Sequence, residues 1–82
     1  MLEELIARVE ERWKAEDPDL IVKGTVRPDG LFDLQVTSRL FEGKDGLERE
    51  AFFWQTFRDL SRDTLVRMTY CLMQTPQEAE GN

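Results

Sequence analysis

A tight turn at residues 27–30 constrains the fold of this chain more than any other sequence feature. It separates a segment rich in β-branched residues, Leu20–Val26, from Phe32–Thr37, in which apolar and polar residues alternate. Pro28 presets its own φ and Gly30 accepts a positive φ, so the intervening residues favour a turn. A hydrophobic period of two is typical of a strand with one buried face. These segments therefore predict an antiparallel hairpin.

Two segments with helical periodicity flank this hairpin. Leu2–Ala15 has apolar residues at helical spacing, and it stops before Pro18 because a residue that precedes proline disfavours the helical region. Arg39–Phe41 is predicted as a single helical turn, and a loop follows at 43–46. Helical periodicity returns in 47–61, and the polar residues 62–64 that follow would end this helix. Its predicted apolar face comprises Leu47, Ala51, Phe53, Trp54, Phe57 and Leu60.

The remaining residues predict a third strand and a short final helix. Leu65–Met73 is short and apolar, with both of its faces partly covered. Thr75 and Glu78 have the spacing of a capping box, and Pro76 would occupy the first helical position. We therefore expect a short helix or a frayed tail over residues 76–82.

The predicted order is helix, strand, strand, helix, strand, helix. It favours an α+β fold, in which a three-stranded mixed sheet carries helices on one face. The chain of 82 residues is long enough for one small domain, which we assign to residues 1–82. The aromatic side chains would supply most of its core and leave little room for a substrate cavity.

Charge and composition exclude several classes of function. Seventeen acidic residues against eleven basic ones give a net charge of -6, which disfavours binding to a phosphate backbone. The chain has no histidine and a single cysteine, Cys71, so the usual general base and the usual metal ligands are missing. The acidic N-terminus and the lack of a long apolar run predict a cytoplasmic protein without a signal peptide or membrane span.

The order of several motifs resembles the BolA family, whose fold is similar to the type II KH arrangement. Ser38–Gly43 resembles the family's S-x-x-F-x-G segment, and Arg49 and Trp54 follow at comparable distances. The closing Thr75–Glu78 resembles its T-P-E-E motif. The resemblance covers Leu20–Ala79. It implies a protein that pairs with monothiol glutaredoxins and can share a [2Fe–2S] cluster with them.

The departures from the family pattern concern its cluster ligands. Arg67 stands where the family has the histidine of the third strand, and Glu50 stands where it has a histidine on the helix. Leu31 and Ala79 replace two further characteristic residues. The loop that often carries a second ligand is reduced to Arg27–Gly30. We therefore expect no cofactor of its own, and no shared cluster.

Several candidate residues admit two interpretations. The Gly43–Gly46 loop matches a G-x-x-G nucleic-acid clamp, or it is an ordinary turn. Arg67 offers five hydrogen-bond donors to a partner's carboxylate, or it is a solvated arginine. Cys71 is a buried small apolar residue or a redox thiol. Of the consecutive aromatics 52–54, at least one must point out of the core.

These observations predict a non-enzymatic adaptor or regulator that acts through protein contacts. The expected partner is a monothiol glutaredoxin or another iron–sulfur trafficking protein, and the chain would be a monomer or a weak homodimer. The predicted interaction surface comprises Phe41, Gly43, Lys44, Arg49, Glu50, Phe53 and Arg67. Two alternatives remain open: a KH-like nucleic-acid or transcription module that uses Gly43–Gly46, and a domain that serves only oligomerisation.

Overall fold

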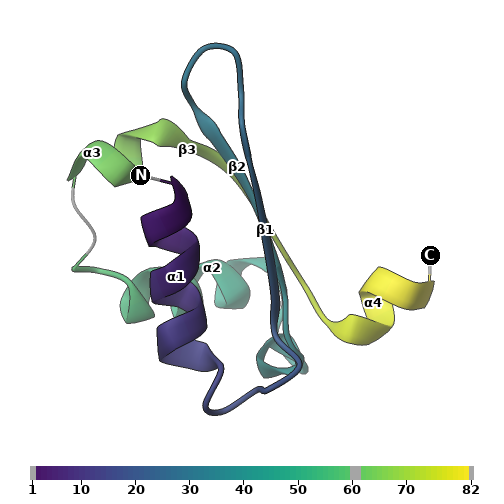
Figure 1. Cartoon of the computed structure of the whole chain (residues 1–82). Coiled ribbons are helices and arrows are strands. Elements are labelled where there is room, and N and C mark those ends of the chain that lie inside the picture. Colours follow the sequence, from purple (N-terminus) through teal and green to yellow (C-terminus); the bar gives the residue numbers. More distant parts are fainter. Residues whose placement is uncertain (1, 60–61, 82) are drawn as a thin grey trace.

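The computed structural model describes residues 2–59 and 62–81 and shows an α+β fold (Figure 1). The predicted order of three strands and their flanking helices is confirmed, with one further helix before the last strand. In chain order the elements are α1 (Leu2–Trp13), β1 (Ile21–Val26), β2 (Phe32–Thr37), the 3₁₀ turn η1 (Arg39–Phe41), α2 (Gly46–Thr56), α3 (Arg62–Arg67), β3 (Met68–Gln74) and α4 (Pro76–Gly81).

The sheet is mixed, as predicted, and its spatial order is β1-β2-β3. β1 and β2 form the antiparallel hairpin, in which Val22 lies opposite Val36. β2 and β3 are parallel, and Val36 lies opposite Met73. Directly opposed residues share a face of the sheet, so these three side chains point to the same side. Both β1 and β3 are edge strands.

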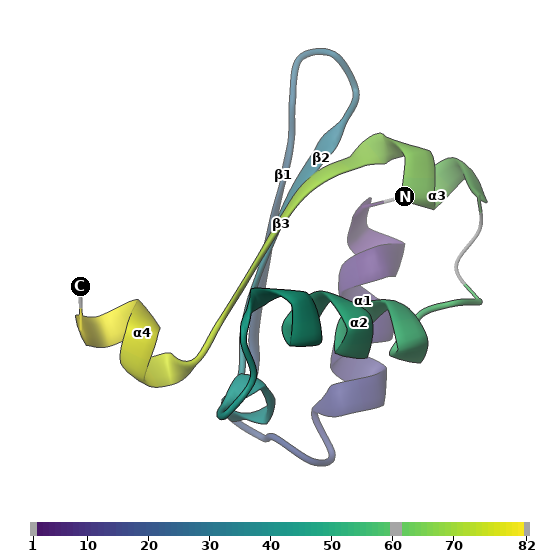
Figure 2. The same cartoon turned by 180° about the vertical axis from the view of Figure 1, so that it is seen from behind.

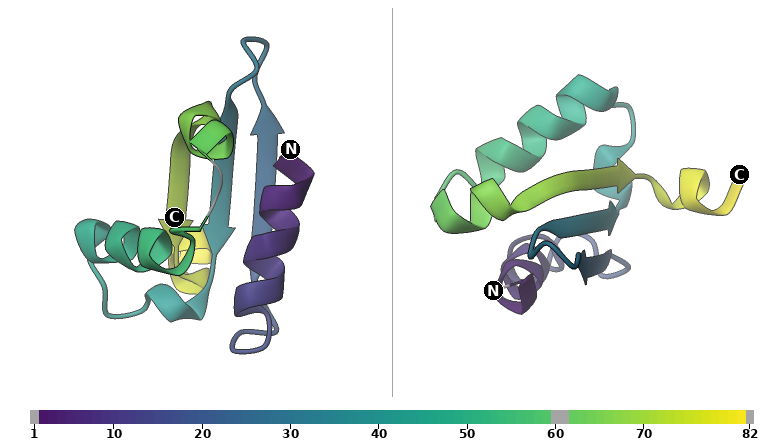
Figure 3. Two further views of the ribbon diagram at one scale, coloured as in Figure 1. Left: turned by 90° about the vertical axis from the view of Figure 1, so that its left-hand side faces the viewer. Right: turned by 90° about the horizontal axis from the view of Figure 1, so that it is seen from above.

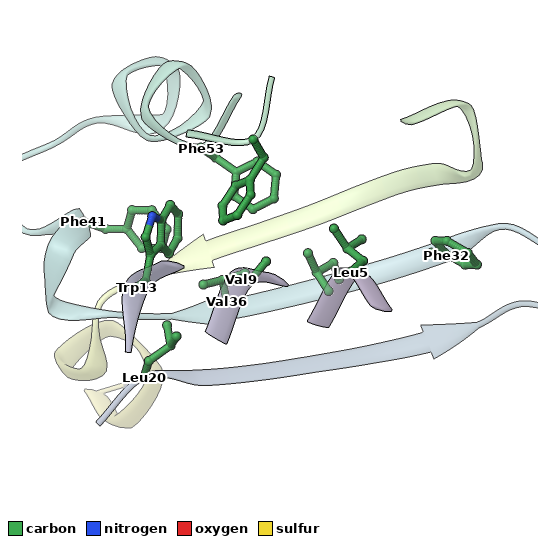
Figure 4. Packing of buried hydrophobic residues seen from close by; sticks show 10 residues of the cluster. Leu5, Val9, Trp13, Leu20, Phe32, Val36, Phe41 and Phe53 are labelled. Atoms are coloured by element: carbon green, nitrogen blue, oxygen red, sulfur yellow. The ribbon is translucent and has the colours of Figure 1, made fainter. Parts of the chain in front are cut away.

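Helices α1 and α2 lie over one face of the sheet, whereas α4 extends away beyond the other side (Figures 1 and 3). The core lies between the sheet and these two helices (Figure 4). Trp13 stacks on Phe52 at a centroid distance of 5.2 Å, and it meets Phe41 and Phe53 edge-on. The buried apolar residues are Leu5, Val9, Trp13, Leu20, Phe32, Leu34, Val36, Phe41, Phe53 and Phe57.

A buried carboxylate joins the end of α1 to the end of β2. Asp17 is 1% exposed, and its Oδ2 accepts a hydrogen bond of 2.7 Å from Ser38 Oγ and one of 3.2 Å from the Arg39 backbone N–H. Its Oδ1 accepts the N–H of Asp19. These bonds stabilise the connection that positions η1 and the start of α2.

The structure corrects the predicted boundaries between the long helix and the third strand. Helix α2 ends at Thr56, while the predicted end at Ser61 and the predicted core residue Leu60 lie outside the described residues. The predicted strand Leu65–Met73 is wrong at its start, because α3 continues to Arg67. Met68 is opposite Phe32, the first residue of β2, so the residues before Met68 have no strand to pair with. Short apolar runs do not distinguish helix from strand by periodicity alone.

Candidate functional site

A groove lies between the start of α2 and β3, on the outer edge of the sheet. Its volume is about 440 Å³, and we call it the α2–β3 groove. In Figure 2, β3 is the strand nearest the viewer and α2 lies beside it. The groove is lined by Gly46, Leu47, Arg49, Glu50, Cys71, Leu72 and Met73.

The backbone of β3 presents hydrogen-bonding groups to this groove. The carbonyl of Gln74 accepts the N–H of Ser38, so the backbone groups of Gln74 point toward β2. These groups alternate in direction along a strand, so the backbone N–H and C=O groups of Met73 and Cys71 point outward from the sheet. The contact of 3.1 Å between Arg49 Nη1 and the Met73 carbonyl agrees with this direction. The hydrogen bonds of the described residues leave both N–H groups and the Cys71 carbonyl free on that side.

Arg49 closes one end of the groove and is committed to the domain itself. Its side chain is only 14% exposed. Besides Met73, its guanidinium contacts the carbonyl of Lys44 and both carboxylate oxygens of Glu78, at 2.7 and 3.0 Å. The hydrogen bond to Glu78 raises the pKa of Arg49, against the opposing effect of its burial. Arg49 thus joins α2, β3 and α4.

Cys71 belongs to the floor of the groove, where its thiol is half-buried. Burial, together with the nearby negative charge of Glu50, raises the pKa of Cys71 to about 12. The thiol therefore stays protonated at neutral pH and behaves as a small apolar group. This environment favours the apolar interpretation over the redox one.

Helix α2 leaves an apolar stripe in solvent. Leu47 is 78% exposed and Trp54 is 36% exposed, and Ala51 between them is exposed as well. Their spacing of i, i+4 and i+7 places them on one side of the helix. Leu72, at the rim of the groove, is 37% exposed. Glu50 adds an exposed carboxylate for which the described residues provide no ion pair.

This arrangement corrects the predicted apolar face of the helix and the predicted interaction surface. Phe41 and Phe53 are completely buried, so they belong to the core and offer no contact surface. Phe53 and Phe57 form the buried face at i, i+4 spacing, whereas Leu47 and Trp54 point away from it. The outward-pointing aromatic of residues 52–54 is Trp54.

The Gly43–Gly46 loop is occupied by contacts within the domain. Gly43 has a φ of 77°, a conformation that favours glycine. Lys44 Nζ donates to the Leu40 carbonyl and lies 4.9 Å from the centroid of the Phe52 ring. Asp45 and Glu48 form a capping box at the start of α2. The loop is therefore built as a helix start.

Arg67 is exposed, but it lies apart from the groove. It is the last residue of α3, at the start of β3, whereas the Gly43–Lys44 loop lies near the end of that strand. Seven strand residues span roughly 20 Å at the usual rise of about 3.3 Å per residue. The structure therefore brings Arg49 and Glu50 together at the groove and separates Arg67 from them.

Sequence reasoning placed Leu47 and Trp54 on the apolar face of the helix, although it expected one of the aromatics 52–54 to point outward, and it missed Leu72 and the capping box Asp45–Glu48. The capping box has a recognisable signal, since aspartate precedes glutamate by three residues at the head of a helical pattern. For Leu47 there is no such signal, because an apolar stripe on a helix looks the same whether or not a sheet covers it.

Comparison with protein-family models, curated proteins and solved structures finds no match for this chain. No group of three or more histidine, cysteine, aspartate or glutamate side chains among the described residues is arranged to hold a metal ion. None of the helices described here is long and apolar enough to cross a membrane.

Proposed function

We propose that this chain is a non-enzymatic adaptor or regulator that acts through protein contacts at the α2–β3 groove. The observation that carries the proposal is the exposed apolar surface formed by Leu47 and Leu72 at the groove, which Trp54 continues along α2. Apolar and aromatic side chains that cluster in solvent are typical of protein-binding surfaces. The acidic net charge supports a protein partner over a nucleic acid.

The proposed partner class rests on the resemblance to the BolA family. That resemblance implies a monothiol glutaredoxin or another iron–sulfur trafficking protein, and the acidic N-terminus favours the cytoplasm as the compartment. Such a glutaredoxin carries its own cysteine and glutathione ligands, so this chain would dock without supplying a ligand. Arg67 remains a proposed second contact, which lies outside the groove and pairs with a carboxylate of the partner.

The nucleic-acid alternative depends on the Gly43–Gly46 loop. Its one lysine, Lys44, is already held by the Leu40 carbonyl and the Phe52 ring. The neighbouring Glu42 and Glu48 would repel phosphate. These contacts support the choice of a protein partner.

Calorimetry against a monothiol glutaredoxin tests the proposal, with visible absorbance recorded in parallel. We expect saturable binding that Leu47→Asp weakens at least tenfold, because a buried carboxylate without a partner opposes association. Arg67→Ala should also weaken binding at least tenfold, whereas Arg8→Ala on α1 serves as the matched control. Anisotropy with single-stranded RNA and DNA tests the alternative. Sub-micromolar nucleic-acid binding without glutaredoxin binding would overturn the proposal.

A further inference from the structure

We propose that the α2–β3 groove binds an extended peptide segment of the partner, which adds to the free edge of β3 and places a basic side chain against Glu50. This inference rests on the proposed function and specifies how a partner would be recognised. It draws on three independent features of the groove: its backbone groups, its apolar side chains and its charge.

The backbone of β3 supplies the pairing edge. The N–H and C=O groups of Cys71 and the N–H of Met73 face outward without a partner among the described residues. An edge strand with free groups is a template for another strand. The Met73 carbonyl is taken by Arg49, so pairing ends at that residue. The added strand is therefore short, and its last paired residue lies opposite Met73.

The side chains around this edge suit an extended segment. Along an added strand, side chains alternate between the two faces. One set would face the start of α2 and the floor of the groove, where Cys71 and Met73 lie. The other set would lie beside Leu72, which points to the uncovered face of the sheet. The groove floor and the surface beside Leu72 both accept apolar side chains, and Leu47 adds an apolar side chain to the lining of the groove.

The charge of the groove selects a basic peptide. Glu50 is exposed and has no ion-pair partner in the described part of the chain, whereas Arg49 is neutralised by Glu78. The groove therefore presents one net negative charge to an incoming strand. A second copy of this chain would bring another Glu50 to the same edge and a net charge of -6 of its own. Like charges oppose that pairing, so the occupant is a basic segment of a different protein.

Fluorescence anisotropy with three capped seven-residue peptides tests this proposal. The first peptide alternates lysine with valine, and the second alternates glutamate with valine. The third has the sequence of the first, but the backbone amide nitrogen of each lysine is methylated. This third peptide keeps its side-chain charges but cannot donate those backbone hydrogen bonds to a strand edge. We expect saturable binding of the lysine peptide, at least tenfold tighter than of either other peptide. Nuclear magnetic resonance should show the Cys71 and Met73 amides shifting together on binding.

Two charge reversals complete the test. Glu50→Lys should weaken the lysine peptide at least tenfold and favour the glutamate peptide, whereas Glu11→Lys on α1 changes the net charge equally and should leave both unchanged. Strand addition would be overturned if the methylated peptide bound as tightly as the unmethylated lysine peptide, or if Glu50→Lys and Glu11→Lys had the same effect. It would also be overturned if binding of the lysine peptide did not saturate at millimolar concentration. A dimer formed through β3 in the free protein would also overturn it.

The outcome for a whole partner is separate from the outcome for strand addition. If glutaredoxin binds with the same affinity to the Glu50→Lys variant, the adaptor function stands and the strand-addition inference is wrong. If the lysine peptide binds as expected and glutaredoxin does not bind, the groove inference stands and the proposed partner class is wrong.

Discussion

Arg49 and Glu78 are joined by two parallel hydrogen bonds of 2.7 and 3.0 Å, which fasten α4 to the start of α2. The same guanidinium holds the Met73 carbonyl, so α4 begins where the free edge of β3 ends. Glu78 also accepts the Thr75 N–H and donates its own N–H to Thr75 Oγ1, which completes the capping box of α4. One glutamate thus both starts the last helix and fixes its position beside the groove.

Acid should release this connection. The hydrogen bond from Arg49, followed by that from Thr75, lowers the pKa of Glu78 from 4.5 to about 2. A carboxyl whose pKa is depressed in the folded state stabilises the protein above its unfolded pKa, and this contribution disappears as the pH falls through the folded value. We therefore expect the melting temperature of the wild-type protein to fall more steeply than that of Glu78→Gln between pH 4.5 and about 2.

Glu80→Gln is the matched control for this titration, because Glu80 lies on the same exposed helix. It should keep the acid response of the wild type. If the melting temperatures of Glu78→Gln and the wild type fall equally with pH, the ion pair contributes nothing to stability in solution. Many exposed ion pairs make no measurable contribution.

Asp17 is expected to be the most sensitive polar position of the fold. Asp17→Ala leaves the buried Ser38 hydroxyl without its acceptor, and a buried unsatisfied group costs about 1–3 kcal/mol. The Arg39 and Asp19 amides lose their acceptor as well, so the loss should lie at or above the upper end of that range. Urea unfolding measures it. Asp19→Ala, at an exposed position two residues away, should change stability by less than about 0.5 kcal/mol.

The hairpin and the start of α4 were predictable because local chemistry determines them. The turn at 27–30, the alternation in Phe32–Thr37 and the capping box Thr75–Glu78 each have a local physical cause, and all three are confirmed. The start of β3 was not predictable in this way. It depends on where β2 begins, 36 residues earlier, and Met68 pairs with Phe32 across that separation.

The candidate site was only partly accessible to sequence reasoning for a related reason. Arg49 and Glu50 were singled out, and both line the groove. Phe53 is predicted both on the apolar face of the helix and in the interaction surface, and it is buried, because the crossing of α2 over the sheet decides whether Phe53 or Trp54 is covered. Periodicity gives the angle between two side chains on a helix, and the packing partner decides which of them is covered.

The thiol of Cys71 should react slowly. A pKa raised from 9.0 to about 12 lowers the thiolate fraction near neutral pH on the order of a thousandfold, and the thiolate is the reactive species. We expect the reaction of the folded protein with a disulfide reagent at pH 8 to be at least a hundredfold slower than that of the protein unfolded in urea. Glu50→Gln should accelerate it slightly, since Glu50 is the smaller cause of the shift. Comparable rates in the two states would show that the groove leaves the thiol solvated.

Neighbouring aromatics on α2 should differ sharply in their contribution to stability. Phe53 is completely buried and contacts both Trp13 and Phe57, so Phe53→Ala should cost about 3–5 kcal/mol through the cavity it leaves. Trp54→Ala removes a ring that is 36% exposed and touches Phe53 edge-on, and it should cost less than half as much.

Leu47→Gln completes this series, because Leu47 is 78% exposed and its replacement should change stability by less than about 0.5 kcal/mol. Urea unfolding of the three variants measures all three effects on the same helix. The order Phe53, Trp54, Leu47 follows from their burial alone. A Leu47→Gln loss as large as that of Trp54→Ala would mean that the apolar stripe is covered in the free protein, and the groove would then be closed to a partner.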